Sequence, residues 1–163
     1  MARALIVGCG CRGRELGAGL LAEGWAVRGT SRSEVGLAAI AEAGIEPAPA
    51  DPDSPGSVLD LVGDVTVVHW LLGSAEGGRE LISGIHGPRL ERLLERFVDT
   101  PVRGFAYEAA GSVPASDLET GAAIVRAAAR TWHIPVEIVD ADPSEPDPWT
   151  KAMLAATARL IGP

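Results

Sequence analysis

The chain has 163 residues, of which 47% are hydrophobic and 22% are charged, and its formal net charge is −8. These values favour one globular domain over residues 1–163 and argue against a disordered chain. The negative charge disfavours nucleic acid as a partner, and no apolar stretch approaches the ~20 residues that span a bilayer. With two cysteines and no secretory leader, we expect a cytoplasmic protein.

Strands and helices are expected to alternate along the chain. The expected strands cover Ala4–Val7, Trp25–Gly29, Ile45–Ala50, Val65–Leu72, Val102–Ala109 and Pro135–Val139. The expected helices cover Cys11–Glu23, a segment from an N-cap at Ser33 to Ala43, Ser57–Val62, a segment that begins at Pro88, a segment from a cap at Asp117 to Trp132, and Trp149–Leu160. Gly73–Gly87 is expected to be irregular, and Asp140–Pro148 is expected to be an extended loop. This alternation predicts an α/β fold: a doubly wound parallel sheet of about six strands, covered on both faces.

A glycine-rich turn joins the first strand to the first helix. Its sequence is Gly8-Cys9-Gly10-Cys11-Arg12-Gly13. In this context GxGxxG predicts a dinucleotide pyrophosphate site, the first part of a Rossmann fold. Gly8 permits the tight turn, Gly10 lets phosphate oxygens approach the backbone, and Gly13 lets the helix pack close to the strand. We expect all six residues to contact the nucleotide; a purely structural glycine turn and an exposed Arg12 are the alternatives.

The end of the second strand bears on the identity of the nucleotide. It reads Thr30-Ser31-Arg32 and carries no carboxylate before Glu34. A guanidinium beside two hydroxyls suits a 2′-phosphate, so we predict NADP(H), with NAD(H) as the second choice. The alternative is that Arg32 is a solvated loop charge. Asp51 is expected to accept a hydrogen bond from the adenine amino group, unless it is a turn former before Pro52. Leu71 and Leu72, at the end of the fourth strand, complete the expected cofactor contacts.

Two groups of residues carry a resemblance to a known family. GCGCRGRELGAGLLAEGWAVRGTSRS, from Gly8 to Ser33, resembles the amino-terminal fingerprint of the atypical and extended short-chain dehydrogenases/reductases, the NAD(P)-dependent epimerase-like group. Ala50-Asp51-Pro52 and Val67-Val68-His69 also resemble that pattern, and the likeness covers roughly the first seventy residues. It implies a Rossmann fold that binds NADP or NAD.

The same family transfers a hydride with a tyrosine and a lysine four residues apart on a helix, and this pair is missing here. The single tyrosine, Tyr107, lies in the fifth strand, and the single lysine, Lys151, is near the other end of the chain. Alanines stand where the family's serines follow that strand, so Ser112 is the nearest hydroxyl. The long carboxy-terminal half that forms the family's substrate lobe also has no counterpart. The resemblance therefore supports the cofactor half and leaves the catalytic half open.

Few side chains remain as catalytic candidates. The acid/base candidates at or near the carboxyl ends of the fourth to sixth strands are His69, Glu108, Asp140 and Asp142. Of these we take Glu108, together with the hydroxyl of Ser112, as the catalytic candidates; a buried Glu108 would need a partner such as Arg103 or a helix N-terminus. His69 is more simply a core histidine, and His86 is interpreted as a surface or packing residue. Two cysteines one residue apart do not make a metal site, so none is expected, and Cys11 is either a redox-sensitive thiol or a small residue in a crowded turn.

Two functions remain open from the sequence. One is a small NADP-dependent oxidoreductase of unknown substrate with altered catalytic residues, in which Glu108, Ser112 or a partner subunit supplies the proton. The other is a non-catalytic module that senses NADP(H) and regulates a partner. The missing tyrosine and lysine favour the second function, and the frequency of enzymes in the family favours the first. We also expect a homodimer, formed through Arg89–Val98 and Leu118–Trp132.

Overall fold

The computed structural model describes residues 2–162. Six parallel strands form one sheet in the order β3-β2-β1-β4-β5-β6. The strands are β1 (Arg3–Val7), β2 (Ala26–Ser31), β3 (Glu46–Pro49), β4 (Val67–Trp70), β5 (Gly104–Glu108) and β6 (Val136–Val139). The order runs outward from β1 in both directions, as in the Rossmann fold, and confirms the predicted doubly wound sheet.

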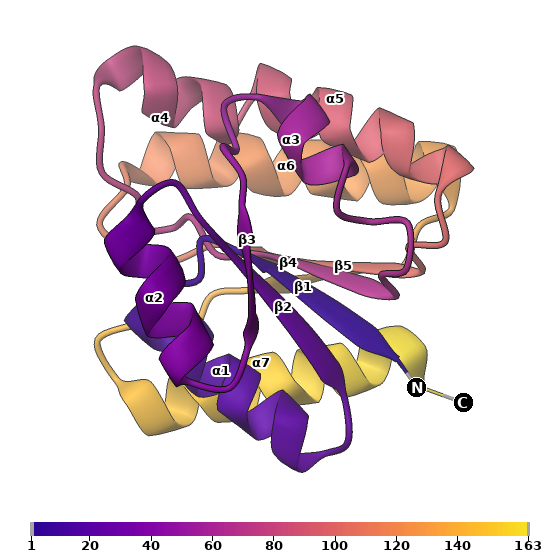
Figure 1. Ribbon diagram of the computed structural model, residues 1–163. Helices are drawn as coiled ribbons and strands as arrows, with labels where there is room; N and C mark the ends of the chain where they lie inside the picture. The colour runs from indigo at the N-terminus through magenta and orange to yellow at the C-terminus, as the bar shows by residue number, and fades with distance from the viewer. Residues whose placement is uncertain (1, 163) are drawn as a thin grey trace.

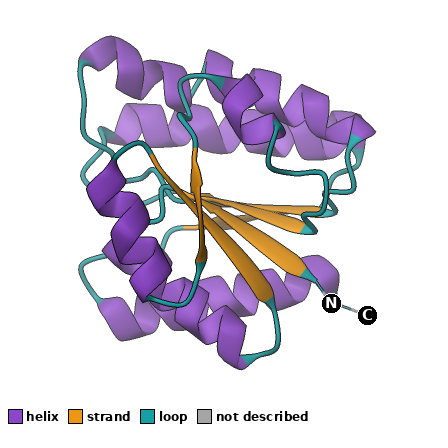
Figure 2. Ribbon diagram, viewed as in Figure 1, coloured by secondary structure: helices purple, strands orange, loops and turns teal. Residues whose placement is uncertain are grey.

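Helices cover both faces of this sheet (Figures 1 and 2). One face carries α3 (Pro55–Leu59), α4 (Arg79–Ile85), α5 (Pro88–Arg96), the short 3₁₀ turn η1 (Phe97–Asp99) and α6 (Ala115–Trp132). The other face carries α1 (Cys11–Ala22) and α7 (Pro146–Ile161), with α2 (Glu34–Glu42) beside β2 and β3. No helix within residues 2–162 has both the length and the apolar character that a membrane crossing requires.

The burial of each strand follows from its residues. All four residues of β4 are buried, because this central strand has helices on both faces and every side chain must pack. β3 lies at the edge of the sheet, and three of its four residues are exposed. Pro47 and Pro49 have no N–H to donate, which an edge strand tolerates because only one of its sides is paired. The sheet therefore separates two apolar cores, one against α3 to α6 and one against α1, α2 and α7.

Several predicted helix ends are confirmed. Ser33 is the N-cap of α2, and its Oγ accepts a hydrogen bond from the Gly36 N–H at 3.0 Å. Gly44 follows the end of α2 with φ +81°, the left-handed conformation that glycine adopts most easily. Pro88 occupies the first turn of α5, where its missing N–H costs nothing.

Three predictions about element ends are wrong. The segment Gly73–Gly87 contains α4, a seven-residue helix. Asp117 is not a cap: α6 begins after Pro114, and Asp117 lies in its first turn, paired with Arg79. Asp140–Pro148 is not all loop, because Pro146 already occupies the first turn of α7. The remaining ends lie within a few residues of the predictions, the ordinary spread of helix and strand boundaries.

Candidate functional site

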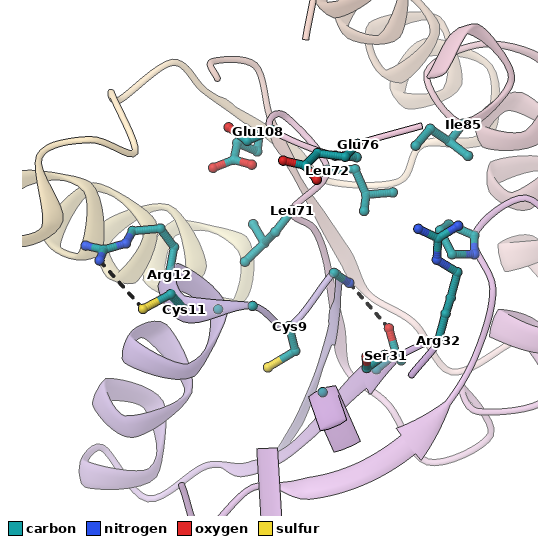
Figure 3. A pocket seen from close by; sticks show the side chains of 18 of the residues that line it. Cys9, Cys11, Arg12, Ser31, Arg32, Leu71, Leu72, Glu76, Ile85 and Glu108 are labelled. Atoms are coloured by element: carbon teal, nitrogen blue, oxygen red, sulfur yellow. Dashed lines mark hydrogen bonds between the residues drawn. The ribbon is translucent and has the colours of Figure 1, made fainter. Parts of the chain in front are cut away.

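A cleft of about 410 Å³ opens at the carboxyl ends of the strands, where the order reverses between β1 and β4 (Figure 3). Open α/β sheets bind their ligands at this position. The lining residues come from the β1–α1 turn, the ends of β2 to β5 and the loops that follow them, α2, α4 and the loop before α7. They are Gly8, Cys9, Gly10, Cys11, Arg12, Gly13, Arg14, Thr30, Ser31, Arg32, Gly36, Ala50, Pro52, Leu71, Leu72, Ser74, Ala75, Glu76, Leu81, Ile85, Glu108 and Pro143.

The glycine turn is fixed by backbone conformation and by β2. Gly8 has φ +81°, and a Cβ there would lie 2.6 Å from the Leu71 carbonyl oxygen. Both the backbone conformation and the lack of space therefore disfavour any larger residue. The Gly8 N–H lies 3.3 Å from Thr30 Oγ1, and the Cys9 N–H donates to the Thr30 carbonyl at 3.1 Å. Thr30 is 2% exposed. Thr30, a buried residue of β2, therefore holds the turn in place through these two hydrogen bonds.

The start of α1 faces the cleft, and no side chain caps its N–H groups. Gly10, its N-cap, offers no side chain, and the first turn holds no acidic residue. The Arg14 N–H is the first to bond back into the helix, to the Gly10 carbonyl at 2.8 Å, and the Gly10 N–H donates to the Gly8 carbonyl at 2.9 Å. The N–H groups of Cys11, Arg12 and Gly13, between them, remain for a ligand. A Cβ on Gly10 would meet no atom within 4 Å, whereas one on Gly13 would lie 3.2 Å from Ile6 Cγ2. This cradle fits an anion held on main-chain amides.

Three arginines surround this cradle. Arg12 Nη1 lies 2.9 Å from Glu15 Oε2, yet this buried nitrogen makes no well-aligned hydrogen bond to any described residue. Arg32 is exposed, and the described residues give it no hydrogen bond or ion pair. Arg14 also lines the cleft, although the sequence interpretation passed over it because it follows the glycine motif. The cleft thus carries local positive charge in a chain whose net charge is negative.

The two cysteines differ in environment. Cys9 is 3% exposed, and burial raises its pKa to about 12. A Cβ on Gly29 would lie 2.7 Å from Cys9 Sγ, so this thiol fills a crowded contact between the turn and β2. Cys11 is exposed at the rim of the cleft. Within residues 2–162, no three His, Cys, Asp or Glu side chains converge as metal ligands would.

Asp51 makes a turn beside the cleft. Its Oδ1 accepts the Asp53 N–H at 2.9 Å, and its own N–H donates to Ser57 Oγ at 2.9 Å. These bonds are typical of a turn-forming aspartate, which was the alternative to the adenine contact. Ala50 and Pro52 line the cleft on either side of Asp51, while Asp51 itself is not among the lining residues.

Glu108 is the buried acidic group of the cleft. It is 4% exposed, with Oε1 accepting the Gly73 N–H at 2.9 Å and Oε2 accepting the Trp149 indole N–H at 2.9 Å. Neither Arg103 nor the backbone of a helix N-terminus is its partner, contrary to the two partners that the sequence offered. Burial raises the pKa of Glu108, and the two hydrogen bonds oppose this shift.

Ser112, the other catalytic candidate, does not line the cleft. It is exposed, and its N–H donates to Ser74 Oγ at 3.2 Å. Ser74, in the loop after β4, does line the cleft. Ser74 was not a predicted site residue, because it lies in the glycine-rich segment expected to be irregular.

Tyr107 and His86 bond to each other behind the cleft. Tyr107 is fully buried, and its hydroxyl lies 2.6 Å from His86 Nδ1. His86 Nε2 lies 2.9 Å from the Leu72 carbonyl, which can only accept, so Nε2 carries the proton and Nδ1 accepts from Tyr107. Burial lowers the pKa of His86 and raises that of Tyr107. His86 is thus a packing residue, and the single tyrosine is occupied structurally.

His69 is a core residue, which confirms its interpretation from the sequence. It is 0% exposed, and Nε2 lies 2.8 Å from Thr157 Oγ1 on α7. Thr157 donates its own proton to the Met153 carbonyl at 2.8 Å, so His69 Nε2 is the donor in their bond. Burial lowers the pKa of His69 to about 4. His69 is not among the residues that line the cleft.

Searches with the sequence find no matching family model and no matching curated protein. Solved structures do resemble this one. The UDP-glucuronic acid 4-epimerase from Bacillus cereus in complex with NAD is 15% identical, with a TM-score of 0.68 over 86% of this chain and 56% of its own. The Citrobacter sp. triphenylmethane reductase complexed with NADP(H) is 18% identical, with a TM-score of 0.61 over 83% of this chain and 48% of its own.

A third similar structure is matched over most of its own length. BdcA (YjgI) from E. coli is 18% identical, with a TM-score of 0.73 over 94% of this chain and 88% of its own. The first two similar proteins are longer, and this chain spans about half of each. At such low identities the comparisons establish the fold. It is a Rossmann fold.

Proposed function

We propose that the cleft binds NADP(H), with the diphosphate on the uncapped start of α1. The observation that carries this proposal is the cradle at Gly10: open space where a Cβ would stand, beneath main-chain N–H groups that no side chain caps. Arg12 Nη1, which is ion-paired with Glu15 but makes no well-aligned hydrogen bond, is a further donor for a phosphate oxygen. Similar structures were solved with NAD and with NADP(H), which supports a nicotinamide dinucleotide as the ligand.

Arg32 supports the choice of NADP(H) over NAD(H). Its guanidinium is exposed at the end of β2, beside the Ser31 side chain, which also lines the cleft. No carboxylate lies among the cleft residues contributed by β2. A 2′-phosphate would therefore meet a forked donor set and a hydroxyl without a competing anion.

The chemistry that NADPH supplies when bound is a hydride, so we propose an oxidoreductase of the short-chain type with altered catalytic residues. Of the two candidates from the sequence, Glu108 lines the cleft and Ser112 does not. A non-catalytic NADP(H) sensor is the second candidate function. It is favoured by the engagement of Tyr107 with His86, which leaves no tyrosine among the cleft residues. The homodimer remains a prediction, which sedimentation at high micromolar concentration tests.

Calorimetric titration tests the binding proposal. Wild-type protein, Arg32→Ala and Arg92→Ala are titrated with NADPH and NADH; Arg92 is an exposed arginine of α5 outside the cleft and serves as the control. Loss of charge-assisted bonds to the 2′-phosphate is expected to weaken NADPH binding by about tenfold or more in Arg32→Ala, since such bonds contribute about 1.5–3 kcal/mol. NADH binding should change little. Equal affinities of wild type for both nucleotides, or an equal loss in both arginine variants, would contradict the proposal.

A further inference from the structure

The charged side chains of the cleft are divided by sign. Arg12 and Arg14 lie in the first turn of α1, and Arg32 lies at the end of β2. The carboxylates come instead from Glu76, in the loop after β4, and from Glu108, at the end of β5. Figure 3 shows Glu76 and Glu108 in the upper part of the view and Arg12 and Arg32 below them. One end of the cleft is therefore cationic, and the other is anionic.

Glu108 is held in place to act as an acceptor. One oxygen accepts the Gly73 N–H and the other accepts the Trp149 indole N–H, and the residue is only 4% exposed. These donors come from two different elements, so the carboxylate cannot rotate without breaking a bond. Each oxygen keeps a second lone pair, and the side chain lines the cleft. An ammonium or iminium N–H in the cleft would donate a further charge-assisted hydrogen bond to this carboxylate.

The residues of the cleft also limit the chemistry at this end. Among the lining residues there is no tyrosine, lysine or histidine. Reduction of a carbonyl carbon by hydride requires a proton on the developing alkoxide. Glu108 is the buried carboxyl group at this end, and the N–H group that each of its oxygens accepts favours its ionised form, which has no proton to give. Reduction of an iminium carbon requires none: a C–H bond forms from the hydride, the π pair of C=N⁺ returns to nitrogen, and a neutral amine results. Two electrons and one hydrogen are transferred, with NADPH as the reductant, so the step balances without a donor side chain.

We infer that the Glu108 end of the cleft binds a small molecule through a cationic nitrogen, an ammonium or iminium group, and so selects amine–imine substrates over carbonyl, carboxylate or phosphate compounds. This inference rests on the proposed function, because it places the cationic group at the opposite end of the cleft from the diphosphate. Leu71 and Leu72 lie between the two ends and provide an apolar surface for the carbon skeleton. The low exposure of Glu108 excludes water that would otherwise weaken its attraction for a cation.

Binding of matched probes tests this inference without turnover. Protein saturated with NADP⁺ is titrated calorimetrically with benzylamine, benzyl alcohol and benzoate, which share one ring and differ in charge at neutral pH. We expect benzylamine to bind at least about tenfold more tightly than benzyl alcohol, and benzoate not to bind. Equal affinity for amine and alcohol, or a preference for benzoate, would overturn the inference.

Charge-neutral variants locate the effect. Glu108→Gln is expected to reduce benzylamine affinity to that of benzyl alcohol, and Glu76→Gln to reduce it severalfold. Glu119→Gln, at an exposed glutamate of α6 outside the cleft, removes the same charge and should leave the affinity unchanged. Because glutamine has one acceptor oxygen, Glu108→Gln leaves one of the two N–H donors, from Gly73 or Trp149, without an acceptor. Its thermal midpoint and NADP⁺ affinity are therefore measured as well. Should that variant fail to fold, Glu76→Gln, whose side chain is exposed, decides the outcome: an affinity equal to that of Glu119→Gln counts against the inference.

A second assay compares two electrophiles of the same ring size. NADPH oxidation is followed with 1-pyrroline, which is protonated to an iminium, and with cyclopentanone. Turnover of the imine alone supports the inference, and turnover of the ketone alone overturns it. Failure of NADP⁺ or NADPH to bind would defeat the proposed function first. Nucleotide binding without selectivity for the amine would defeat only the present inference.

Discussion

Acid should destabilise this protein through His69, at the centre of the sheet. Its ring is 0% exposed, and burial lowers its pKa from 6.5 to about 4. On acidification the unfolded chain takes up a proton on this residue near pH 6.5, and the folded chain does so only near pH 4. The unfolded state therefore binds more protons within this window, and the free energy of unfolding falls as pH falls through it.

The size of this effect follows from the two pKa values. The difference between 6.5 and about 4 corresponds to roughly 3 kcal/mol in the free energy of unfolding. About 2 kcal/mol of this is already lost at pH 5, because the unfolded-state histidine is then nearly all protonated.

Urea unfolding at pH 8 and pH 5 measures this loss in wild type and in His69→Leu. Leucine fills a similar volume and removes His69 Nδ1, a buried atom without a hydrogen-bond partner among the described residues. It also removes the bond to Thr157, whose hydroxyl keeps its own acceptor, the Met153 carbonyl. We expect the variant to lose about 2 kcal/mol less than wild type between the two pH values. The other titrating groups are common to both proteins and cancel in this difference.

His133→Asn provides the control, since His133 is exposed and asparagine tolerates its left-handed backbone, with φ 57°. This variant should follow wild type at both pH values. If wild type and His69→Leu lost stability in parallel on acidification, the burial argument for His69 would be refuted.

Three further predictions concern the cleft and the residues behind it. Gly8→Ala should lower the free energy of unfolding by at least about 1 kcal/mol, because φ is +81° and the added Cβ would lie 2.6 Å from a carbonyl oxygen. Gly10→Ala, where the added Cβ meets open space, should keep wild-type stability and lose on the order of tenfold in NADPH affinity. Urea unfolding and calorimetry measure the two effects, and the reverse pattern would contradict the cradle. Tyr107→Phe should lose about 1–3 kcal/mol in urea unfolding, because His86 Nδ1 is left without a donor, while NADPH affinity stays unchanged; a large loss of affinity would show that the hydroxyl reaches the ligand. Cys11 is exposed in the cleft, so maleimide should label it, and NADPH should slow the labelling; equal rates with and without nucleotide, measured by mass spectrometry, would speak against binding there.

The sheet could be predicted from the sequence because its signals are local. Apolar runs such as Val65–Leu72 mark buried parallel strands, and the glycine motif marks the turn after β1. The helix α4 could not be predicted in the same way. Seven residues long and bordered by glycines, it is held by tertiary contacts: Ile82 and Ile85 are buried in the core that α5 and α6 share. Without α4, the wall of the cleft formed by Leu81 and Ile85 was missing from the prediction.

Partners that are distant in sequence account for the other differences. A carboxylate at position 108 signals that a partner must exist, yet Gly73 lies 35 residues away and Trp149 lies 41 residues away. Asp117 has the residue type of a helix cap, but its partner, Arg79, lies 38 residues away on a helix that was not predicted. The glycine turn before α1 consists of six consecutive residues and could be recognised in the sequence, whereas the surroundings of Glu108 bring together Gly73 and Trp149 from separate segments.

The central claim is that the main-chain amides at the start of α1 hold a dinucleotide diphosphate, and a crystal structure of the protein with saturating NADPH tests it most directly. We predict diphosphate oxygens within hydrogen-bonding distance of the Cys11 and Arg12 N–H groups, with the 2′-phosphate beside Arg32. Density for the nucleotide elsewhere, or a cradle that stays empty at saturation, would contradict this account.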